Sequence, residues 1–596
     1  MCLNLPTTVF EFMDWAWPQI ETYFHDLAAR PLNANAESGD LHRHGTADIT
    51  AWLADWTHLS LLLQETYWRL YVATTINTAD EAAQRRFYTF LDEIYPRAQA
   101  ADQTLKEKLL RSGLEPEGFE IPLRNLRAEA DLYRVQNLPL LGDELKYWIE
   151  YDQIIGAQTV EWEGKEVTLL QLTPVYQNPD RGRRERAWRL AAARQLADRD
   201  RITDLWVTLM GVRRQLADNA GRTDYRAYRW QQLLRFDYTP EDCKRFHNAI
   251  EQVVVPAVRR VLDHRRQRLG LESLRPWDLD VDLLGRPRLR PFREVSELID
   301  KTSAIFHCVD PQLGGYFDLM RREGLLDLEN RKSKAPGGYC TDFYVTRRPF
   351  IFMNAVGLHE DVHTLLHEGG HAFHTFEMTR LPYAQQYQVG MEFNEVASMA
   401  MELLGSPYLS LDGQGFYTPQ EAARARTEHL VTMLRFWPYM AVVDAFQHWV
   451  YENHAAASDP ANCDAAWTEL WQRFMGGVDW SGLDDVMVTG WQRKAHITQT
   501  PFYYIEYGLA QLGALQIWRN SFSDQAGAVA AYRRALALGG TVPLPQLYAT
   551  AGARLAFDAD TLGEAVGLIE KTIARLELVL PSQPEPQCHD QEDDPQ

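Results

Sequence analysis

Cysteine is scarce in this chain, and long apolar runs are missing. The six cysteines among 596 residues lie far apart, and none belongs to a CxxC pair. This usage excludes a disulfide framework and a thiolate zinc site, and it is typical of a reducing compartment. The sequence also lacks the roughly 18 uninterrupted apolar residues of a membrane span and the basic-then-apolar pattern of a secretion signal. We therefore expect a soluble cytoplasmic protein without a membrane partner.

Positive charge is also in short supply. The chain has 61 Lys and Arg residues against 82 Asp and Glu residues, which gives a formal net charge of −21. Such a surface repels a polyanion, so we expect no nucleic-acid partner. The few local basic runs, such as residues 181–184 and 259–266, are typical of solvated helix faces.

Strand patterns are few, and helical spacing dominates. Short strands are predicted around residues 160–169, as a hairpin centred on Glu163-Gly164, and within residues 338–353. Helices are predicted to begin at the capping boxes Thr418–Glu421 and Thr561–Glu564, and another to end at Gly539-Gly540. The fold class predicted is mainly α-helical, with a small β-sheet just before the candidate site.

The length of the chain exceeds that of a single small core, so two to four structural units are expected. Without a repeat or a low-complexity linker, the division is approximate. We assign residues 1–205 to an N-terminal helical region and residues 206–580 to a catalytic region. Residues 581–596 are polar and acidic, and we expect this tail to be disordered.

The strongest chemical signal is the HExxH pattern of His367, Glu368 and His371. Residues four apart share one face of a helix, so both imidazoles can reach one ion. A zinc ion makes a neighbouring water easier to ionise, and the carboxylate of Glu368 can take its proton as a general base. Gly369 and Gly370 each cost on the order of 1 kcal/mol in a helix, which indicates a place where backbone or substrate comes close.

A third metal ligand is expected on a second helix, over residues 391–404, that follows a short loop. Spacing alone does not choose among Glu392, Glu395 and Glu402. Glu395 is favoured because Ala397, Ser398 and Ala400 allow the two helices to pack closely. The sequence therefore predicts one metal ion held by His367, His371 and Glu395, and zinc suits such ligands best.

Other polar residues of the same helix are given structural roles. His359, His363 and His374 are each interpreted as hydrogen-bonded histidines and not as ligands. The metzincin arrangement is excluded because no histidine follows at the required distance. Asp361 is predicted to be the hydrogen-bond partner of a ligand imidazole.

Taken together, these residues resemble the oligoendopeptidase F branch of the thimet oligopeptidase family of zinc peptidases. The resemblance rests on residues 361–374, on Glu395 to Glu402, on Gly337 to Tyr339 with residues 349–354, and on the segment from His496 to Gly508. It implies a two-lobed helical body with a deep central channel that admits short unfolded peptides. It further implies that His496 and a tyrosine face the metal across the cleft, with the tyrosine hydroxyl stabilising the oxyanion. Tyr507 is preferred for this role, then Tyr504.

The function that follows is a zinc endopeptidase that cuts short oligopeptides and carries one zinc ion per chain. A carboxypeptidase or peptidyl-dipeptidase on the same scaffold is the nearest alternative, and it requires a cation for the C-terminal carboxylate of the substrate. A non-catalytic peptide-binding protein is a second alternative. The sequence gives neither the oligomeric state nor the cleavage-site preference.

Overall fold

A computed structural model describes residues 5–32 and 44–579 of the chain, with side chains from residue 49 onward in the second range. The predicted acidic tail, residues 581–596, lies outside these residues. No helix within them is long and apolar enough to cross a membrane.

Helices make up most of the first half of the molecule, interrupted by one hairpin. In chain order the elements are α1 (Val9–Phe12), α2 (Trp17–Ala29), α3 (His44–Ile76), α4 (Glu81–Thr89), α5 (Tyr95–Ser112), α6 (Glu120–Leu132), α7 (Asn137–Gly156), β1 (Thr159–Trp162), β2 (Lys165–Thr168), α8 (Arg181–Leu196), α9 (Arg199–Asn219), α10 (Tyr225–Gln232), α11 (Pro240–Ala249), α12 (Val255–Arg268), α13 (Val295–Val309) and α14 (Pro311–Arg322).

The second half begins with three strands and continues as helices. These elements are β3 (Leu326–Glu329), β4 (Tyr339–Phe343), β5 (Arg348–Ala355), α15 (His359–Met378), α16 (Met391–Gly405), α17 (Pro419–Glu452), α18 (His454–Ala457), α19 (Pro460–Phe474), α20 (Asp484–Val488), α21 (Ala495–Thr498), α22 (Tyr504–Ser521), α23 (Gln525–Leu536), α24 (Leu544–Thr550) and α25 (Ala559–Glu577).

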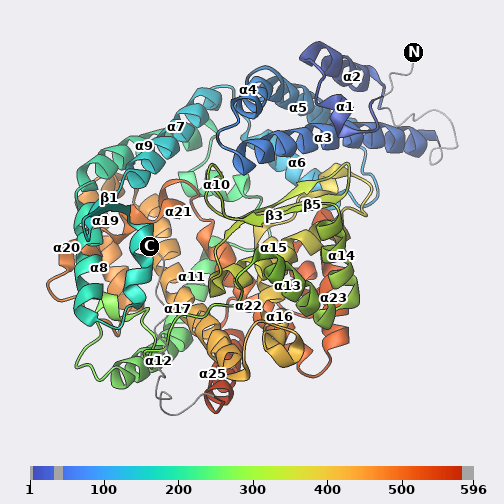
Figure 1. Cartoon of the computed structure of the whole chain (residues 1–596). Coiled ribbons are helices and arrows are strands. Elements are labelled where there is room, and N and C mark those ends of the chain that lie inside the picture. Colours follow the sequence, from blue (N-terminus) through green and yellow to red (C-terminus); the bar gives the residue numbers. More distant parts are fainter. Residues whose placement is uncertain (1–4, 33–43, 580–596) are drawn as a thin grey trace.

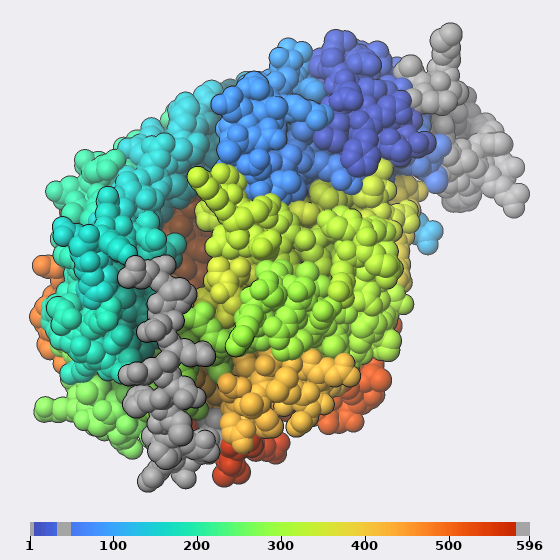
Figure 2. All heavy atoms as spheres, viewed as in Figure 1, coloured from blue at the N-terminus to red at the C-terminus, as the bar shows by residue number. Residues whose placement is uncertain are grey.

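The chain encloses a hollow between two sides of the molecule. In Figure 1 the segment α7–α9 descends along the left, whereas the sheet and α13–α16 lie to the right, with α1–α6 above them. Figure 2 shows the surface hollowed between the teal α7–α9 side and the yellow-green side that carries the sheet. This agrees with the predicted helical body with a central channel.

The helix predictions were confirmed in outline, with corrections at some ends. The hairpin β1–β2 turns at Glu163 and Gly164 as expected, and Thr418 and Glu421 form the predicted capping box of α17. The last helix, α25, begins earlier than predicted, because Asp558 and not Thr561 caps it. Leu205 lies inside α9, so the chain is helical at the proposed division between the two regions.

The three-stranded sheet, of order β3-β5-β4, separates two groups of helices. β3 was not predicted from the sequence. Side chains alternate along β5: Phe350 and Phe352 pack in one cluster with Val72 of α3, whereas Ile351 and Met353 belong to the main core, which includes Val362 of α15. The sheet therefore holds α15 on one face while α3 covers the other.

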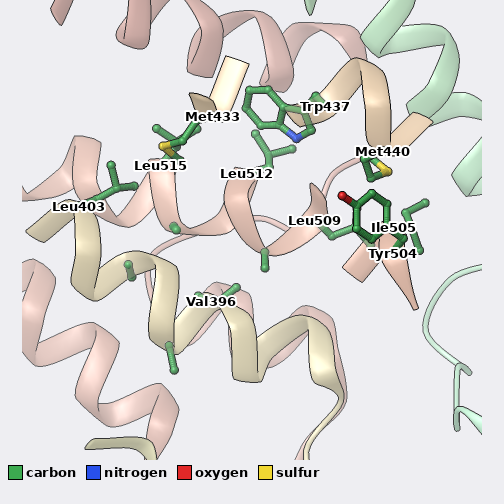
Figure 3. Packing of buried hydrophobic residues seen from close by; sticks show 14 of the residues in the cluster. Val396, Leu403, Met433, Trp437, Met440, Tyr504, Ile505, Leu509, Leu512 and Leu515 are labelled. Carbon is green, nitrogen blue, oxygen red and sulfur yellow. The ribbon is translucent and has the colours of Figure 1, made fainter. Parts of the chain in front are cut away.

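A close contact between α15 and α16 fixes the candidate site. A β-carbon built on Gly370 would lie 2.4 Å from the carbonyl oxygen of Ala397 and 2.6 Å from Cα of Ser398. Only glycine permits this approach, so the unusual glycine in the motif serves helix packing. On its other side α16 packs against α22, where Val396 and Leu403 face Leu512 and Leu515 (Figure 3).

Candidate active site

The middle of α15 presents the two motif histidines side by side. Their rings, on His367 and His371, have centroids 5.0 Å apart, as residues one turn apart on a helix face should. The helix is started by Asp361, whose Oδ2 accepts the backbone N–H groups of Val356 and Leu358, both at 2.8 Å. The prediction that Asp361 supports a ligand imidazole is therefore wrong: its carboxylate caps the helix.

Glu395 on α16 completes a three-residue cluster with these histidines. Its Oε2 lies 3.4 Å from Nε2 of His367 and 3.8 Å from Nε2 of His371. The Ser398 hydroxyl donates to the same oxygen at 3.0 Å. Glu395 is 5% exposed, so its carboxylate points into the site and away from bulk water.

The two carboxylates that competed with Glu395 have other partners. Glu392 accepts a hydrogen bond of 2.5 Å from the hydroxyl of Tyr238 and lies beside Arg235 in a buried ion pair. Glu402 reaches the other side of His367, where its Oε1 lies 2.7 Å from Nδ1. Nδ1–H therefore donates to Glu402, so Nε2 is the nitrogen that faces Glu395 and would bind an ion.

The cluster of His367, His371 and Glu395 fits a divalent ion such as zinc. One atom from each residue lies within 4.8 Å of the others. Two imidazole nitrogens and one carboxylate oxygen leave a fourth position open, which is the pattern of a catalytic zinc site. The hydrogen bond from His367 to Glu402 adds the outer carboxylate partner that zinc-binding histidines commonly have.

Glu368 lies next to this cluster, close enough for the charges of His367 and Glu395 to act on its carboxylate. It is 8% exposed, and burial raises its pKa to about 7, against a smaller lowering by His367. A backbone hydrogen bond from Cys340, on the edge strand β4, also acts on the carboxylate. A carboxylate with a pKa near neutrality takes and returns a proton readily.

The aromatic segment after His496 brings two tyrosines toward the carboxylates. The hydroxyl of Tyr503 lies 3.5 Å from Oε1 of Glu395. Tyr507 forms a hydrogen bond with Tyr503, and although burial is the main cause of its pKa of about 12, both Glu395 and Glu368 also raise it. Tyr504 lies beside Tyr507, with ring centroids 5.9 Å apart, but neither Glu395 nor Glu368 acts on its hydroxyl.

His496 lies among these tyrosines and is held neutral. Its ring centroid is 4.8 Å from that of Tyr504 and 6.1 Å from that of Tyr507. Burial and, to a smaller extent, the charge of Lys494 lower its pKa to about 4. Lys494 itself lies over the ring of Tyr504, with Nζ 4.0 Å from the centroid.

The remaining histidines of α15 differ in their surroundings. Nδ1 of His359 lies 2.7 Å from the hydroxyl of Tyr417, as expected for a hydrogen-bonded histidine. His374 is buried against Phe393, and burial lowers its pKa to about 3. His363 has no hydrogen-bond partner for either ring nitrogen among the described residues. The prediction of a hydrogen-bonded role is therefore wrong for His363.

Sequence reasoning missed two residues of the site. Tyr503 was not chosen, although the run of three tyrosines offered it, because spacing does not tell which ring turns toward the cleft. Glu402 was considered only as a ligand. The seven-residue step from Glu395 to Glu402, two helical turns on one face, was the signal for its supporting position.

Fold and site together define a helical peptidase of the metal-dependent class. The chain belongs to peptidase family M3, whose family model matches residues 175–566. Its relatives include an oligoendopeptidase F homolog of Mycoplasma pneumoniae, which is 23% identical over an alignment of 501 residues that covers 73% of this chain and 75% of the relative.

Two solved structures extend the likeness to nearly the whole chain. PZ peptidase A with an inhibitor is 28% identical with a TM-score of 0.81, covering 96% of this chain and 99% of the other. A structure named for oligoendopeptidase F has the same identity and TM-score, covering 94% and 96%. The predicted resemblance to the oligoendopeptidase F branch and the predicted fold class are confirmed.

Proposed function

We propose that this peptidase is a zinc endopeptidase that cuts internal bonds of short, unfolded peptides. The observation that carries the proposal is the position of Glu368, a buried carboxylate one residue from His367 in a cluster with the ligand geometry of a catalytic zinc site. His367, His371 and Glu395 would hold the ion. When bound, zinc lowers the pKa of water and polarises a peptide carbonyl.

The chain supplies the proton transfers and the orientation of the substrate. Glu368 takes the proton of the attacking water at its carboxylate and gives it to the nitrogen of the leaving amine. The hydroxyl of Tyr507 donates to the carbonyl oxygen as negative charge develops there, and Tyr503 orients that hydroxyl through their hydrogen bond. His496, whose lowered pKa keeps it neutral at physiological pH, would donate a hydrogen bond to the substrate backbone.

The substrate is expected to lie along β4 as an added strand. β4 pairs with β5 on one side only, and Cys340 in it contacts Glu368. An extended peptide that pairs with this edge brings its backbone carbonyl past the general base. The substrate would reach this edge through the hollow between the two sides of the molecule (Figure 2), and we expect a flexible peptide to enter it more readily than a folded domain.

We also propose that the protein works in the cytoplasm. Cys243, Cys308, Cys340 and Cys463, the cysteines within the described residues, are all free thiols, as expected in a reducing compartment.

Mass spectrometry of a pool of short peptides incubated with the protein tests the proposal. Internal cuts that stop with a chelator and return with zinc are expected. The proposed activity would be contradicted if the protein carries one zinc ion per chain but cuts no peptide of a diverse pool.

One observation favours removal of C-terminal fragments as a second candidate function. Lys494 places an ammonium group beside Tyr504, and burial lowers its pKa to about 8, so it is charged at pH 7. We propose Lys494 as the cation that would bind the C-terminal carboxylate of a substrate in this second function. Pairs of substrates with free and amidated C-termini separate the two functions. An endopeptidase cuts both substrates alike, whereas an enzyme that recognises the C-terminus does not cut the amidated peptide. In that second case, Lys494→Met should weaken cleavage of the peptide with the free carboxylate.

A further inference from the structure

Four histidines form a ladder along one face of α15. His359, His363, His367 and His371 follow one another at steps of four residues, which places them on one helix face. His367 and His371 belong to the proposed zinc centre, whereas His359 and His363 have no part in it. Eight residues, or about 12 Å of helix, separate His363 from His371.

The carboxylates on α16 repeat at nearly the same distance. Glu395 and Glu402 are seven residues apart, about 10.5 Å along the helix. Glu395 lies opposite His367 and His371. Glu402, two turns further along α16, therefore lies opposite His363. The pairing of two helices thus produces a second place where imidazole and carboxylate meet.

Three elements bring ligand atoms together at this second place. Nε2 of His429, on α17, lies 3.0 Å from Oε2 of Glu402, and Nδ1 of His363 lies 3.8 Å from the same oxygen. The ligand atoms of all three residues lie within 4.8 Å of one another, as do those of His367, His371 and Glu395. Tetrahedral zinc separates such atoms by about 3.3 Å, so both clusters have similar and suitable dimensions.

His363 gives an independent sign of a missing ligand. Both of its ring nitrogens are shielded from solvent and have no hydrogen-bond partner among the described residues. A neutral imidazole has one donor and one acceptor, and each costs about 1–3 kcal/mol when buried unpaired. An ion bound at one nitrogen satisfies the acceptor. The ring of His363 also lies close to the second imidazole of the cluster, with its centroid 4.3 Å from that of His429.

A third group of possible ligands, formed by Cys243, Asp444 and His448, is less suitable. Nη1 of Arg226 lies 3.3 Å from Nδ1 of His448. A guanidinium is always charged and can only donate, so it already supplies a positive charge there and opposes a second cation. It also fixes the tautomer, because the nitrogen that it faces must be the acceptor.

We propose that His363, Glu402 and His429 form a second site for a divalent transition-metal ion of the zinc class. Glu402 connects it to the first centre, since Oε1 faces His367 while Oε2 faces His429 and His363. An ion at the second site draws charge from the carboxylate that orients His367. It therefore binds more weakly than the first, and its binding lowers peptide hydrolysis. The site itself stands apart from the proposed peptidase activity, and only this last effect rests on it.

Equilibrium dialysis of the holoenzyme against zinc, with bound metal counted by mass spectrometry, tests the site. The native chain is expected to bind one tight and one weaker equivalent. His363→Phe, which keeps an aromatic ring in place, and His429→Gln are each expected to lose the weaker equivalent and keep the tight one. His264→Gln, at an exposed histidine of α12, is the matched control and is expected to keep both.

Cobalt gives a second readout that does not depend on activity. Loaded with Co²⁺, the native chain should add visible absorption as the weaker equivalent binds, and His363→Phe should not. A native chain that stops at one equivalent, or a weaker equivalent that persists in both variants, would overturn the proposal. Failure of the peptidase proposal is distinguishable, because a chain that binds two equivalents but cuts no peptide refutes only the activity.

Discussion

Nδ1 of His367 lies 2.7 Å from Oε1 of Glu402, a residue on the neighbouring helix α16. This hydrogen bond determines which nitrogen of the imidazole carries its proton and therefore which one can bind an ion. It also joins the proposed zinc centre to the cluster around His363. A carboxylate that serves two imidazoles on opposite sides couples the two places electrostatically.

The first prediction concerns this carboxylate. Glu402→Gln keeps the shape of the side chain but removes its charge, so His367 becomes a less basic ligand. Affinity for the first zinc ion should fall by about 10–100-fold, as for other outer partners of zinc-binding histidines. Competition with a chromophoric chelator measures this change. Unchanged affinity would show that Glu402 does not support His367.

The contact at Gly370 supports a second prediction. An added β-carbon meets backbone atoms of α16 at 2.4 Å, so Gly370→Ala must push the helices apart. We expect a loss of about 1–3 kcal/mol in stability and weaker zinc binding, because Glu395 moves with α16. Urea unfolding and metal titration check both effects.

Gly567→Ala is the matched control for this change. Gly567 lies within helix α25, and a β-carbon there meets nothing within 4 Å. This substitution should raise stability by about 0.5–1 kcal/mol, since alanine favours a helix. Equal losses in the two variants would contradict the packing argument.

The role of Gly370 also illustrates what the sequence can predict. Helical spacing, capping boxes and the HExxH pattern depend on residues close in the chain, and they correctly placed α15, α16 and α17. The glycines indicated a close approach but not its partner, because Ala397 is 27 residues away and reaches Gly370 only through the loop geometry.

Positions that depend on side-chain orientation were beyond the sequence. Tyr503, Tyr504 and Tyr507 have the same chemistry, and only their orientation in the fold decides that Tyr503 and Tyr507, but not Tyr504, interact with Glu395. β3 is only four residues long, so its single Leu-Asp-Leu-Glu alternation is too short to distinguish it from a turn, and it escaped prediction. Asp361 has the residue type of a metal-site partner, yet free backbone N–H groups at the helix start bind it instead.

The third prediction separates the general base from a ligand. Glu368→Gln keeps the size of the side chain but cannot accept a proton, so peptide hydrolysis should fall by about 10²–10⁴-fold while one zinc ion stays bound. His367→Ala should instead lose the metal. Metal content and kcat measured on the same samples check the pair. Full activity in Glu368→Gln would remove this residue from the mechanism.

The fourth prediction ranks the tyrosines by their hydroxyl groups. Tyr507→Phe should lower kcat by about 10²-fold with little change in KM, because the lost donor acts only as charge develops. Tyr503→Phe should have a smaller effect, since its hydroxyl only orients that of Tyr507. Tyr504→Phe is the internal control and should act nearly as the native chain. A large loss in Tyr504→Phe alone would transfer the oxyanion role to that residue.

The last prediction concerns pH and the burial of His496. Its pKa in the folded chain is about 4, below the value of 6.5 for an exposed histidine, chiefly because of burial. Between these values the unfolded chain binds a proton that the folded chain does not. The titration of His496 therefore leaves the free energy of unfolding unchanged above pH 6.5. As the pH falls toward 4, it lowers this free energy by on the order of 1–3 kcal/mol.

A variant without this titration should lack that part of the decline. The free energy of unfolding of His496→Gln, measured in urea at pH 7 and pH 4.5, should fall less than that of the native chain. His264→Gln, at an exposed position, should follow the native chain at both pH values. Lys494→Met should reduce the difference, because removing the neighbouring charge allows His496 to protonate at higher pH. Parallel losses in all four proteins would mean that His496 protonates as readily in the folded chain as in the unfolded one.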